Sequence, residues 1–126
     1  MFADTDFLLA LAKDSDWLKG SATFIAEKNK GNIRASVSVM IELALLCKRY
    51  EIDVVKAFID ALEIVYLNEA TRQLCLAAAM YIKKDGLSTF DAFHAAYCGN
   101  DKIISSDKAY EKIGLERIAL EMKPNN

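Results

Sequence analysis

The sequence has little of what would divide a chain into parts or carry it into a membrane. Its single proline is at position 124 and no repeat or low-complexity tract is present, so we expect no linker between domains. No apolar run approaches the roughly 20 residues that cross a bilayer, and Asp4 and Asp6 would interrupt a signal peptide. The length matches one domain with a core of ordinary size. We therefore expect one cytoplasmic domain, residues 1–126.

A surplus of positive charge is also missing. The chain has 16 Lys and Arg against 18 Asp and Glu, which gives a net charge of -2. Proteins that bind nucleic acid over a broad surface usually carry a strong positive field. Any contact with nucleic acid must therefore be local.

Cysteines are few and follow no known pattern. Cys47, Cys75 and Cys98 are odd in number, and their spacing is not that of a metal site. Each lies among apolar neighbours, as free thiols do inside proteins of reducing compartments. We expect three buried free thiols rather than a disulfide or a zinc site.

What the sequence does contain is a regular alternation of strand and helix patterns. Strands are predicted at residues 1–3, 33–35, 64–67, 102–105 and 116–120. Helices are predicted from Asp6, from Ser15 to Lys30, after Ser36, after Asp53, from Asn68 to Asp85, after Ser88 and over residues 107–113. The order is βααβααβαα followed by βαβ. It predicts an α/β protein, a three-layer α/β/α sandwich with a mainly parallel central sheet.

Four acidic residues stand where apolar segments meet helices. They are Asp4, Glu42, Asp91 and Asp107. The carboxyl ends of parallel strands meet at one edge of a sheet, so acids far apart in sequence can converge there. Taken singly, Asp91 and Asp107 are explained by helix capping or the helix dipole. Glu42 lies inside an apolar helical segment, where a carboxylate needs a cation, a salt bridge or a raised pKa.

The set of acids predicts a particular chemistry. Carboxylates that converge without cysteine or histidine ligands form a hard oxygen site, which suits Mg²⁺ or Mn²⁺ rather than zinc or copper. A metal held in this way can bridge a phosphodiester, lower the pKa of a bound water and neutralise the charge that develops during in-line attack. Hydrolysis of a phosphodiester would then need no nucleophile from the protein.

Four segments that carry these acids also resemble a known family. Residues 4–9, which begin Asp4-Thr5-Asp6, residues 36–43, residues 87–96 and residues 103–110 occur in the order of the motifs of PIN domains, the nuclease fold of many VapC-type toxins. The resemblance covers essentially the whole chain. Each motif is weakly specific alone, and their order makes the combination more specific.

The resemblance implies a Mg²⁺- or Mn²⁺-dependent ribonuclease. In it, the catalytic residues and metal ligands would be Asp4, Glu42, Asp91 and Asp107, with Ser105 as a nearby polar support. Family members often carry Asn where this chain has Asp6, and we expect Asp6 to cap the following helix rather than to add charge to the site. The implied partners are the RNA substrate, an antitoxin protein that occludes the cleft, and a second copy of the chain in a homodimer. The apolar fraction of 53% also favours a dimer.

Other polar residues near the acids have more ordinary expectations. Arg34, Lys102 and Lys108 are predicted to contact RNA, because strand ends and the turn that follows lie near the acids. His94, the one histidine, follows Asp91 by three residues among apolar neighbours. We expect it to be a satisfied, partly buried structural residue rather than a general base.

Two alternatives stay open at this point. A short strand followed by Asp4-Thr5-Asp6 is also similar to the haloacid dehalogenase phosphatases, in which the first Asp is a nucleophile, although Leu8 departs from that family's motif. The other alternative is a non-catalytic module that binds RNA or protein. An acyl-phosphate on Asp4 would identify the phosphatase, and RNA that is bound but uncut would identify the module.

Overall fold

Five short strands form a parallel sheet in the computed structural model, which describes residues 1–68 and 71–122 and, at Arg72, the backbone alone. The strands are β1 (Phe2–Ala3), β2 (Ile33–Ser36), β3 (Val65–Asn68), β4 (Lys102–Ser105) and β5 (Glu116–Ala119). Their order across the sheet is β3-β2-β1-β4-β5, and each neighbouring pair is parallel. The predicted parallel sheet is confirmed.

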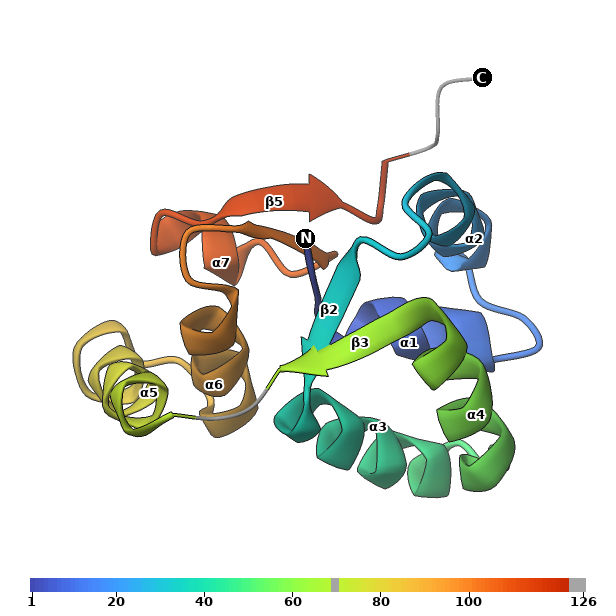
Figure 1. The fold of residues 1–126 in the computed structure, drawn as a ribbon, viewed down its shortest axis with the longest axis horizontal. Coiled ribbons are helices and arrows are strands. Elements are labelled where there is room, and N and C mark those ends of the chain that lie inside the picture. Colours follow the sequence, from blue (N-terminus) through green and yellow to red (C-terminus); the bar gives the residue numbers. More distant parts are fainter. Residues whose placement is uncertain (69–70, 123–126) are drawn as a thin grey trace.

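Helices cover both faces of this sheet. They are α1 (Thr5–Ala12), α2 (Lys19–Lys28), α3 (Val37–Arg49), α4 (Val54–Ile64), α5 (Arg72–Asp85), α6 (Thr89–Cys98) and α7 (Ala109–Lys112). The crossovers through α1 to α4 lead from β1 outward to β3, and those through α5 to α7 lead back to β4 and on to β5. Because such crossovers are right-handed, the two groups of helices lie on opposite faces. Figure 1 shows α5, α6 and α7 on one side and α1, α2 and α4 on the other, as expected for the predicted sandwich.

The central strand β1 has two residues and is completely enclosed. Phe2 and Ala3 are both fully buried. Phe2 pairs with Arg34 of β2 on one side and with Ile103 of β4 on the other. Burying a side chain such as Phe2 contributes about 2 to 3 kcal/mol. The chain that leaves β1 therefore starts from a fixed position in the middle of the sheet.

Polar side chains cap the N-termini of three helices. The Ser36 hydroxyl accepts a hydrogen bond from the Val39 N–H at 3.2 Å, and the Ser88 hydroxyl accepts one from the Asp91 N–H at 3.4 Å. Asp53 caps α4 in the same way. These three predicted N-caps are confirmed. As a result, the first turns of α3 and α6 are held in place.

The second helix begins later than predicted. The Asp16 carboxylate accepts a hydrogen bond from the Leu18 N–H at 2.8 Å, which holds a turn where a helix was expected from Ser15. Helix α2 therefore starts at Lys19. The Trp17 side chain lies outside the helix and is 76% exposed.

The boundary around β3 also differs from the prediction. Ile64 ends α4 instead of beginning the strand, and Asn68 is the last residue of β3 instead of the start of a helix. Helix α5 follows Thr71, whose hydroxyl accepts a hydrogen bond from the Leu74 N–H at 3.2 Å. Residues 69–70, on which the predicted helix start partly fell, lie outside the described residues. A β-branched and aromatic run predicts a strand, but it does not fix where the preceding helix ends.

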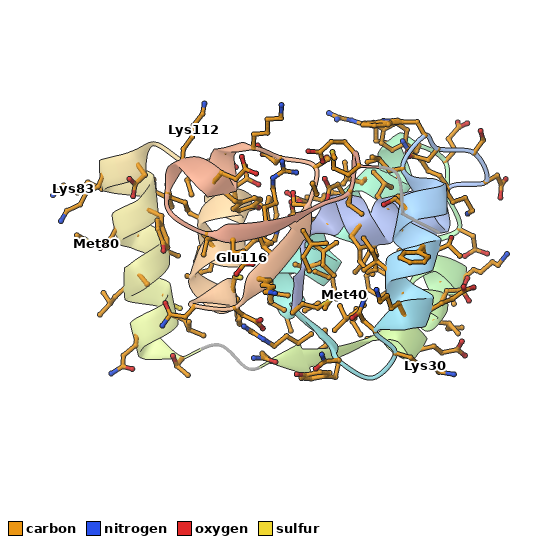
Figure 2. The ribbon with its side chains drawn as sticks, turned by 90° about the horizontal axis from the view of Figure 1, so that it is seen from above. Lys30, Met40, Met80, Lys83, Lys112 and Glu116 are labelled. Carbon is orange, nitrogen blue, oxygen red and sulfur yellow. The ribbon has the colours of Figure 1, made fainter. Side chains whose placement is uncertain are left out.

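Helix α5 packs on α6 through small side chains. Ala78 of α5 forms a buried cluster with Ala92 and Ala96 of α6. The outer side of α5 exposes Met80 and Lys83 (Figure 2) and also Cys75, so the prediction of three buried thiols is wrong for this one. Cys47 and Cys98 are free and buried, as predicted. Within the described part of the chain, no helix has both the length and the apolar character needed to cross a membrane.

Candidate active site

The carboxyl ends of the strands gather polar and acidic side chains. Asp4 follows β1 directly, and its N–H donates to the Ile104 carbonyl of β4 at 3.1 Å. Ser105 ends β4, and Asp107 comes two residues later. Glu42 lies on α3, the helix that follows β2. The strand order therefore brings residues from three separate segments to one edge of the sheet.

Asp4 is buried and firmly oriented. Its side chain is the N-cap of α1, with Oδ1 accepting from the Thr5 N–H at 2.8 Å. Its Oδ2 accepts from the Ser105 hydroxyl at 2.7 Å. Burial raises the pKa of Asp4 to about 7, and the charge of Asp6 adds to the rise, although His94, Ser105 and Thr5 oppose it. The fold thus holds a carboxylate whose negative charge is poorly compensated.

Glu42 and His94 complete a tight group with Asp4. His94 Nε2 lies 3.3 Å from Glu42 Oε1, 3.6 Å from Asp4 Oδ1 and 3.1 Å from the Thr5 hydroxyl. Burial raises the pKa of Glu42, but hydrogen bonds from His94 and Thr5 more than offset this and leave it below its ordinary value. Within the described chain, these three are the metal-binding side chains whose ligand atoms all lie within 4.8 Å of one another.

Asp6 has a different position from the one expected. Asp4, and not Asp6, caps α1, because β1 ends at Ala3 and the helix begins at once. Asp6 Oδ2 accepts a hydrogen bond from the Ser106 N–H at 2.8 Å and another from the Ser106 hydroxyl. Burial raises the pKa of Asp6, and its own charge raises that of Asp4. Asp6 therefore adds negative charge beside Asp4, which was the less favoured expectation.

Asp91 and Asp107 each have a hydrogen bond to a hydroxyl group near this edge, and neither belongs to the tight group of Asp4, Glu42 and His94. The Tyr110 hydroxyl donates to Asp91 Oδ1 at 3.2 Å. The Ser105 hydroxyl, which donates to Asp4, accepts from the Asp107 N–H at 2.9 Å. Burial raises the pKa of Tyr110, and the charges of Asp4, Asp91 and Asp107 raise it further. The Tyr110 hydroxyl thus contacts one of the predicted acids, Asp91, and the charges of Asp4 and Asp107 also act on it.

Sequence reasoning missed two residues of this site. His94 was expected to be a partly buried structural residue, yet it is fully buried and its ring contacts two of the acids. Tyr110 lies in the predicted helix over residues 107–113, and its pattern indicates no role at the site. His94 follows Asp91 by three residues, and Tyr110 follows Asp107 by three residues. On a helix, this spacing places two side chains on the same side. That spacing was the available signal.

Two of the three residues predicted to contact RNA lie elsewhere. The Arg34 guanidinium donates to Asp101 and to the carbonyl groups of Tyr97 and Cys98, so it is engaged in the fold. Lys102 is the first residue of β4, at the opposite end of the strand from Ser105, and pairs with Glu116. Both residues lie away from the carboxyl ends of the strands, so they are not near the acids, and their contact with RNA stays a prediction. Lys108 directly follows Asp107 and is exposed, so its RNA contact stays a prediction.

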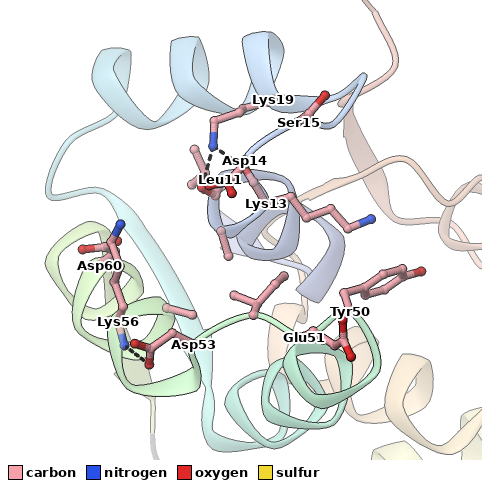
Figure 3. Close-up of a pocket in the computed structure, with 13 residues that line it drawn as sticks. Leu11, Lys13, Asp14, Ser15, Lys19, Tyr50, Glu51, Asp53, Lys56 and Asp60 are labelled. Atoms are coloured by element: carbon pink, nitrogen blue, oxygen red, sulfur yellow. Dashed lines mark hydrogen bonds between the residues drawn. The ribbon is translucent and has the colours of Figure 1, made fainter.

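A pocket of about 730 Å³ lies at the other end of α1 from Asp4 (Figure 3). It is lined by the end of α1, by Tyr50 after α3 and by the first turns of α4. Two of its lysines have partners within the fold, since Lys19 donates to the Leu11 carbonyl at 3.0 Å and Lys13 lies over the Tyr50 ring at 3.9 Å. The hollow and the acidic group are therefore separate features.

Asp4 gives the protein a characteristic dependence of stability on pH. Its pKa is about 7 in the folded state against an ordinary 3.8, so between these values the folded protein binds the extra proton. Without divalent ions, this residue should lower the free energy of unfolding as pH rises through that range, by up to about 1.4 kcal/mol per unit. Asp4→Asn keeps an acceptor for the Thr5 N–H and should remove this decline. Urea unfolding in EDTA at about pH 5 and about pH 8 measures it. Equal pH slopes for both proteins would contradict the assignment.

The Tyr110 hydroxyl should contribute modestly to stability. Tyr110→Phe removes one oxygen and the hydrogen bond to Asp91 without opening a cavity. We expect a loss of about 1 kcal/mol in the free energy of unfolding. Tyr66→Phe is the matched control, since Tyr66 is 51% exposed, and it should leave stability unchanged. Equal effects of the two substitutions would show that the Asp91 contact adds nothing.

Comparison with known proteins agrees with this geometry. A family model described as "PIN domain" matches residues 1–115. The fold is similar to that of VapC20 from Mycobacterium tuberculosis, at 23% identity with a TM-score of 0.81 over 98% of each chain. It is also similar to a toxin–antitoxin complex from Klebsiella pneumoniae, at 14% identity with a TM-score of 0.73, covering 94% of this chain and 96% of that one. VapBC-1 from nontypeable Haemophilus influenzae follows at 21% identity with a TM-score of 0.69, covering 96% and 98%.

Among curated proteins, none matches the sequence. The match to the family model covers most of the chain and includes the segments that carry Asp4, Glu42, Asp91 and Asp107. The α/β/α fold with a parallel sheet is the one expected from the resemblance. The chain belongs to the PIN domain family.

Proposed function

We propose that this protein is a cytoplasmic endoribonuclease that uses Mg²⁺ or Mn²⁺ to hydrolyse RNA, and that it is the toxin of a toxin–antitoxin pair. The observation that carries the proposal is the burial of Asp4 beside Glu42, with the pKa of Asp4 raised to about 7. Such crowding costs folding free energy and attracts a cation. Membership of the PIN domain family supports nuclease chemistry.

The residues at the edge of the sheet fit a hard divalent cation. Asp4 and Glu42 would hold it with carboxylate oxygens, the ligands that Mg²⁺ and Mn²⁺ prefer, and Asp91 and Asp107 would complete the acidic set. When bound, the metal would supply charge neutralisation at the phosphate and a water of lowered pKa. This chemistry requires neither a serine nor a cysteine nucleophile.

The protein's own contribution is to fix the carboxylates before RNA arrives. Ser105 and the Thr5 N–H each hold one oxygen of Asp4. Tyr110 holds one oxygen of Asp91. Groups oriented in advance need little reorganisation when charge develops on the substrate, and this lowers the barrier. Lys108, exposed beside Asp107, is the cation best placed to meet the RNA backbone.

The proposed partner is an antitoxin that covers the acidic edge. The similar Mycobacterium tuberculosis protein is named a Sarcin-Ricin loop cleaving toxin, and the Klebsiella pneumoniae structure is a toxin–antitoxin complex. A nuclease whose acids are set in place before substrate arrives needs a separate means of restraint. A protein that occludes these acids would provide it.

Cleavage of RNA should depend on the metal and on each acid. We expect single-stranded RNA to be cut with Mg²⁺ or Mn²⁺ and left intact with EDTA. Asp4→Asn, Glu42→Gln, Asp91→Asn and Asp107→Asn should each reduce the rate by about 100-fold or more, because each removes charge that the metal requires. Asp14→Asn, which neutralises an exposed acid away from the site, should keep the rate of the unmodified protein. The assay follows the 5′ ends of a labelled RNA.

Three outcomes would reject this function. Full cleavage in EDTA would exclude the metal. An acyl-phosphate trapped on Asp4 would favour the phosphatase chemistry that a short strand followed by Asp4-Thr5-Asp6 also resembles. RNA that shifts in a gel but stays uncut under every metal would favour a binding module.

A homodimer is the second part of the proposal. Val55, Ile59 and Leu62 form an apolar stripe on α4 and are 65%, 57% and 49% exposed. Such a stripe is more than a small monomer usually leaves in water. Light scattering at micromolar concentration should give about twice the chain mass of 14.0 kDa. Ile59→Glu should give a monomer, while Trp17→Gln, at an exposed residue outside α4, should not. A mass of 14.0 kDa for the unmodified protein would exclude the dimer.

A further inference from the structure

His94 is enclosed by the core on one side and by acids on the other. It is fully buried. Its ring lies near those of Phe2 and Phe90, with centroid distances of 6.4 and 6.2 Å. Its Nε2 faces oxygens of Thr5, Glu42 and Asp4 at 3.1 to 3.6 Å. The two ring nitrogens therefore have opposite surroundings.

The surroundings decide which nitrogen carries the proton. Nδ1 has no hydrogen-bond partner among the residues that the structure describes. A proton there would be a buried donor without an acceptor. Nε2 lies 3.3 Å from an oxygen of Glu42, whose pKa is below its ordinary value, and an ionised carboxylate only accepts hydrogen bonds, so it would repel a bare lone pair on Nε2. Both considerations place the proton on Nε2.

The position of this proton decides between two roles for His94, a hydrogen-bond donor and a metal ligand. The distances alone allow both. The spacing of Nε2 from the carboxylate oxygens also suits neighbouring ligands around one metal ion. A histidine that binds metal through Nε2 must carry its proton on Nδ1, and such histidines almost always donate that proton to a carboxylate, carbonyl or water. No described residue accepts from Nδ1. The ligand role therefore lacks its supporting contact.

We propose that His94 is a positioning residue that holds Glu42 against Asp4 through an Nε2 proton, and that it is not a metal ligand; the metal part of this inference rests on the proposed function. Glu42 is on a flexible side chain that is 23% exposed, and Asp4 repels it. A donor between the two carboxylates offsets that repulsion and keeps Glu42 turned inward. The site then offers carboxylate oxygens to the metal, which is the donor set of Mg²⁺ and Mn²⁺.

The proton can be located directly because His94 is the one histidine in the chain. In protein labelled with ¹⁵N-histidine, we expect a single ring with a pyrrole-type signal at Nε2 and a pyridine-type signal at Nδ1. Adding Mg²⁺ should leave the Nε2 proton in place. A pyridine-type Nε2 in the free protein, or loss of the Nε2 proton when Mg²⁺ binds, would overturn the proposal. This measurement needs no substitution and no activity.

Two substitutions test the consequence for metal binding. His94→Gln places an amide donor near the same oxygens and should keep the Mn²⁺ affinity, measured by calorimetry, within about threefold. His94→Leu removes the donor and should weaken Mn²⁺ binding about tenfold or more. Equal affinities for both variants and the unmodified protein would overturn the positioning role. If the unmodified protein binds neither Mn²⁺ nor Mg²⁺, the proposed function fails, while the nitrogen signals still decide where the proton lies.

Discussion

The burial of Asp4 at the end of β1 is the constraint on which the rest of the site depends. A carboxylate in this position loses its hydration, and the charge of Asp6 lies beside it. Neighbouring hydrogen-bond donors reduce the free-energy cost of burying this carboxylate. Ser105 and the Thr5 N–H donate to Asp4, and His94 faces it from the other side. These contacts reduce the cost without cancelling it, since the pKa of Asp4 stays at about 7.

The position of Asp4 in turn depends on the sheet. Two strands enclose β1, and its two residues are fully buried, so α1 must begin at the centre of the carboxyl edge. A short helix that starts there points its N-terminal N–H groups toward the acids, which favours negative charge. The same junction therefore serves as strand end, helix cap and acidic centre. This explains why one residue, Asp4, has contacts with three other segments of the chain.

Much of the architecture could be predicted from the sequence, because apolar periodicity and capping residues are local signals. The order of strands and helices was predicted correctly, as were the caps at Ser36, Asp53 and Ser88. The start of α2 was not, since a single hydrogen bond from the Leu18 N–H to Asp16 outweighs a helical pattern. The predicted β3 was misplaced by one residue, since a β-branched and aromatic run does not fix where the preceding helix ends.

The sequence singles out the acids of the candidate site but not the side chains that contact them. Alternating strands and helices imply a parallel sheet, and the carboxyl ends of its strands bring Asp4, Asp107 and the helix of Glu42 to one edge. Which side chain contacts which acid depends on how far apart the packed helices lie. A single sequence does not give these distances. His94 and Tyr110 are core residues, and each has one polar atom that reaches the acids. Arg34 looked available because its partner Asp101 is far away in sequence.

The alanine contact between α5 and α6 has a consequence for Asp91. Ala92 directly follows Asp91 and packs against Ala78 of α5, and methyl groups meet there without any hydrogen bond. Methyl groups allow the two helix backbones to approach closely, and any larger side chain would act as a wedge between them. The packing of these methyl groups thus helps to place the acid at the start of α6, together with the Ser88 cap. Its alignment with the other carboxylates depends on the smallness of residues that carry no chemistry themselves.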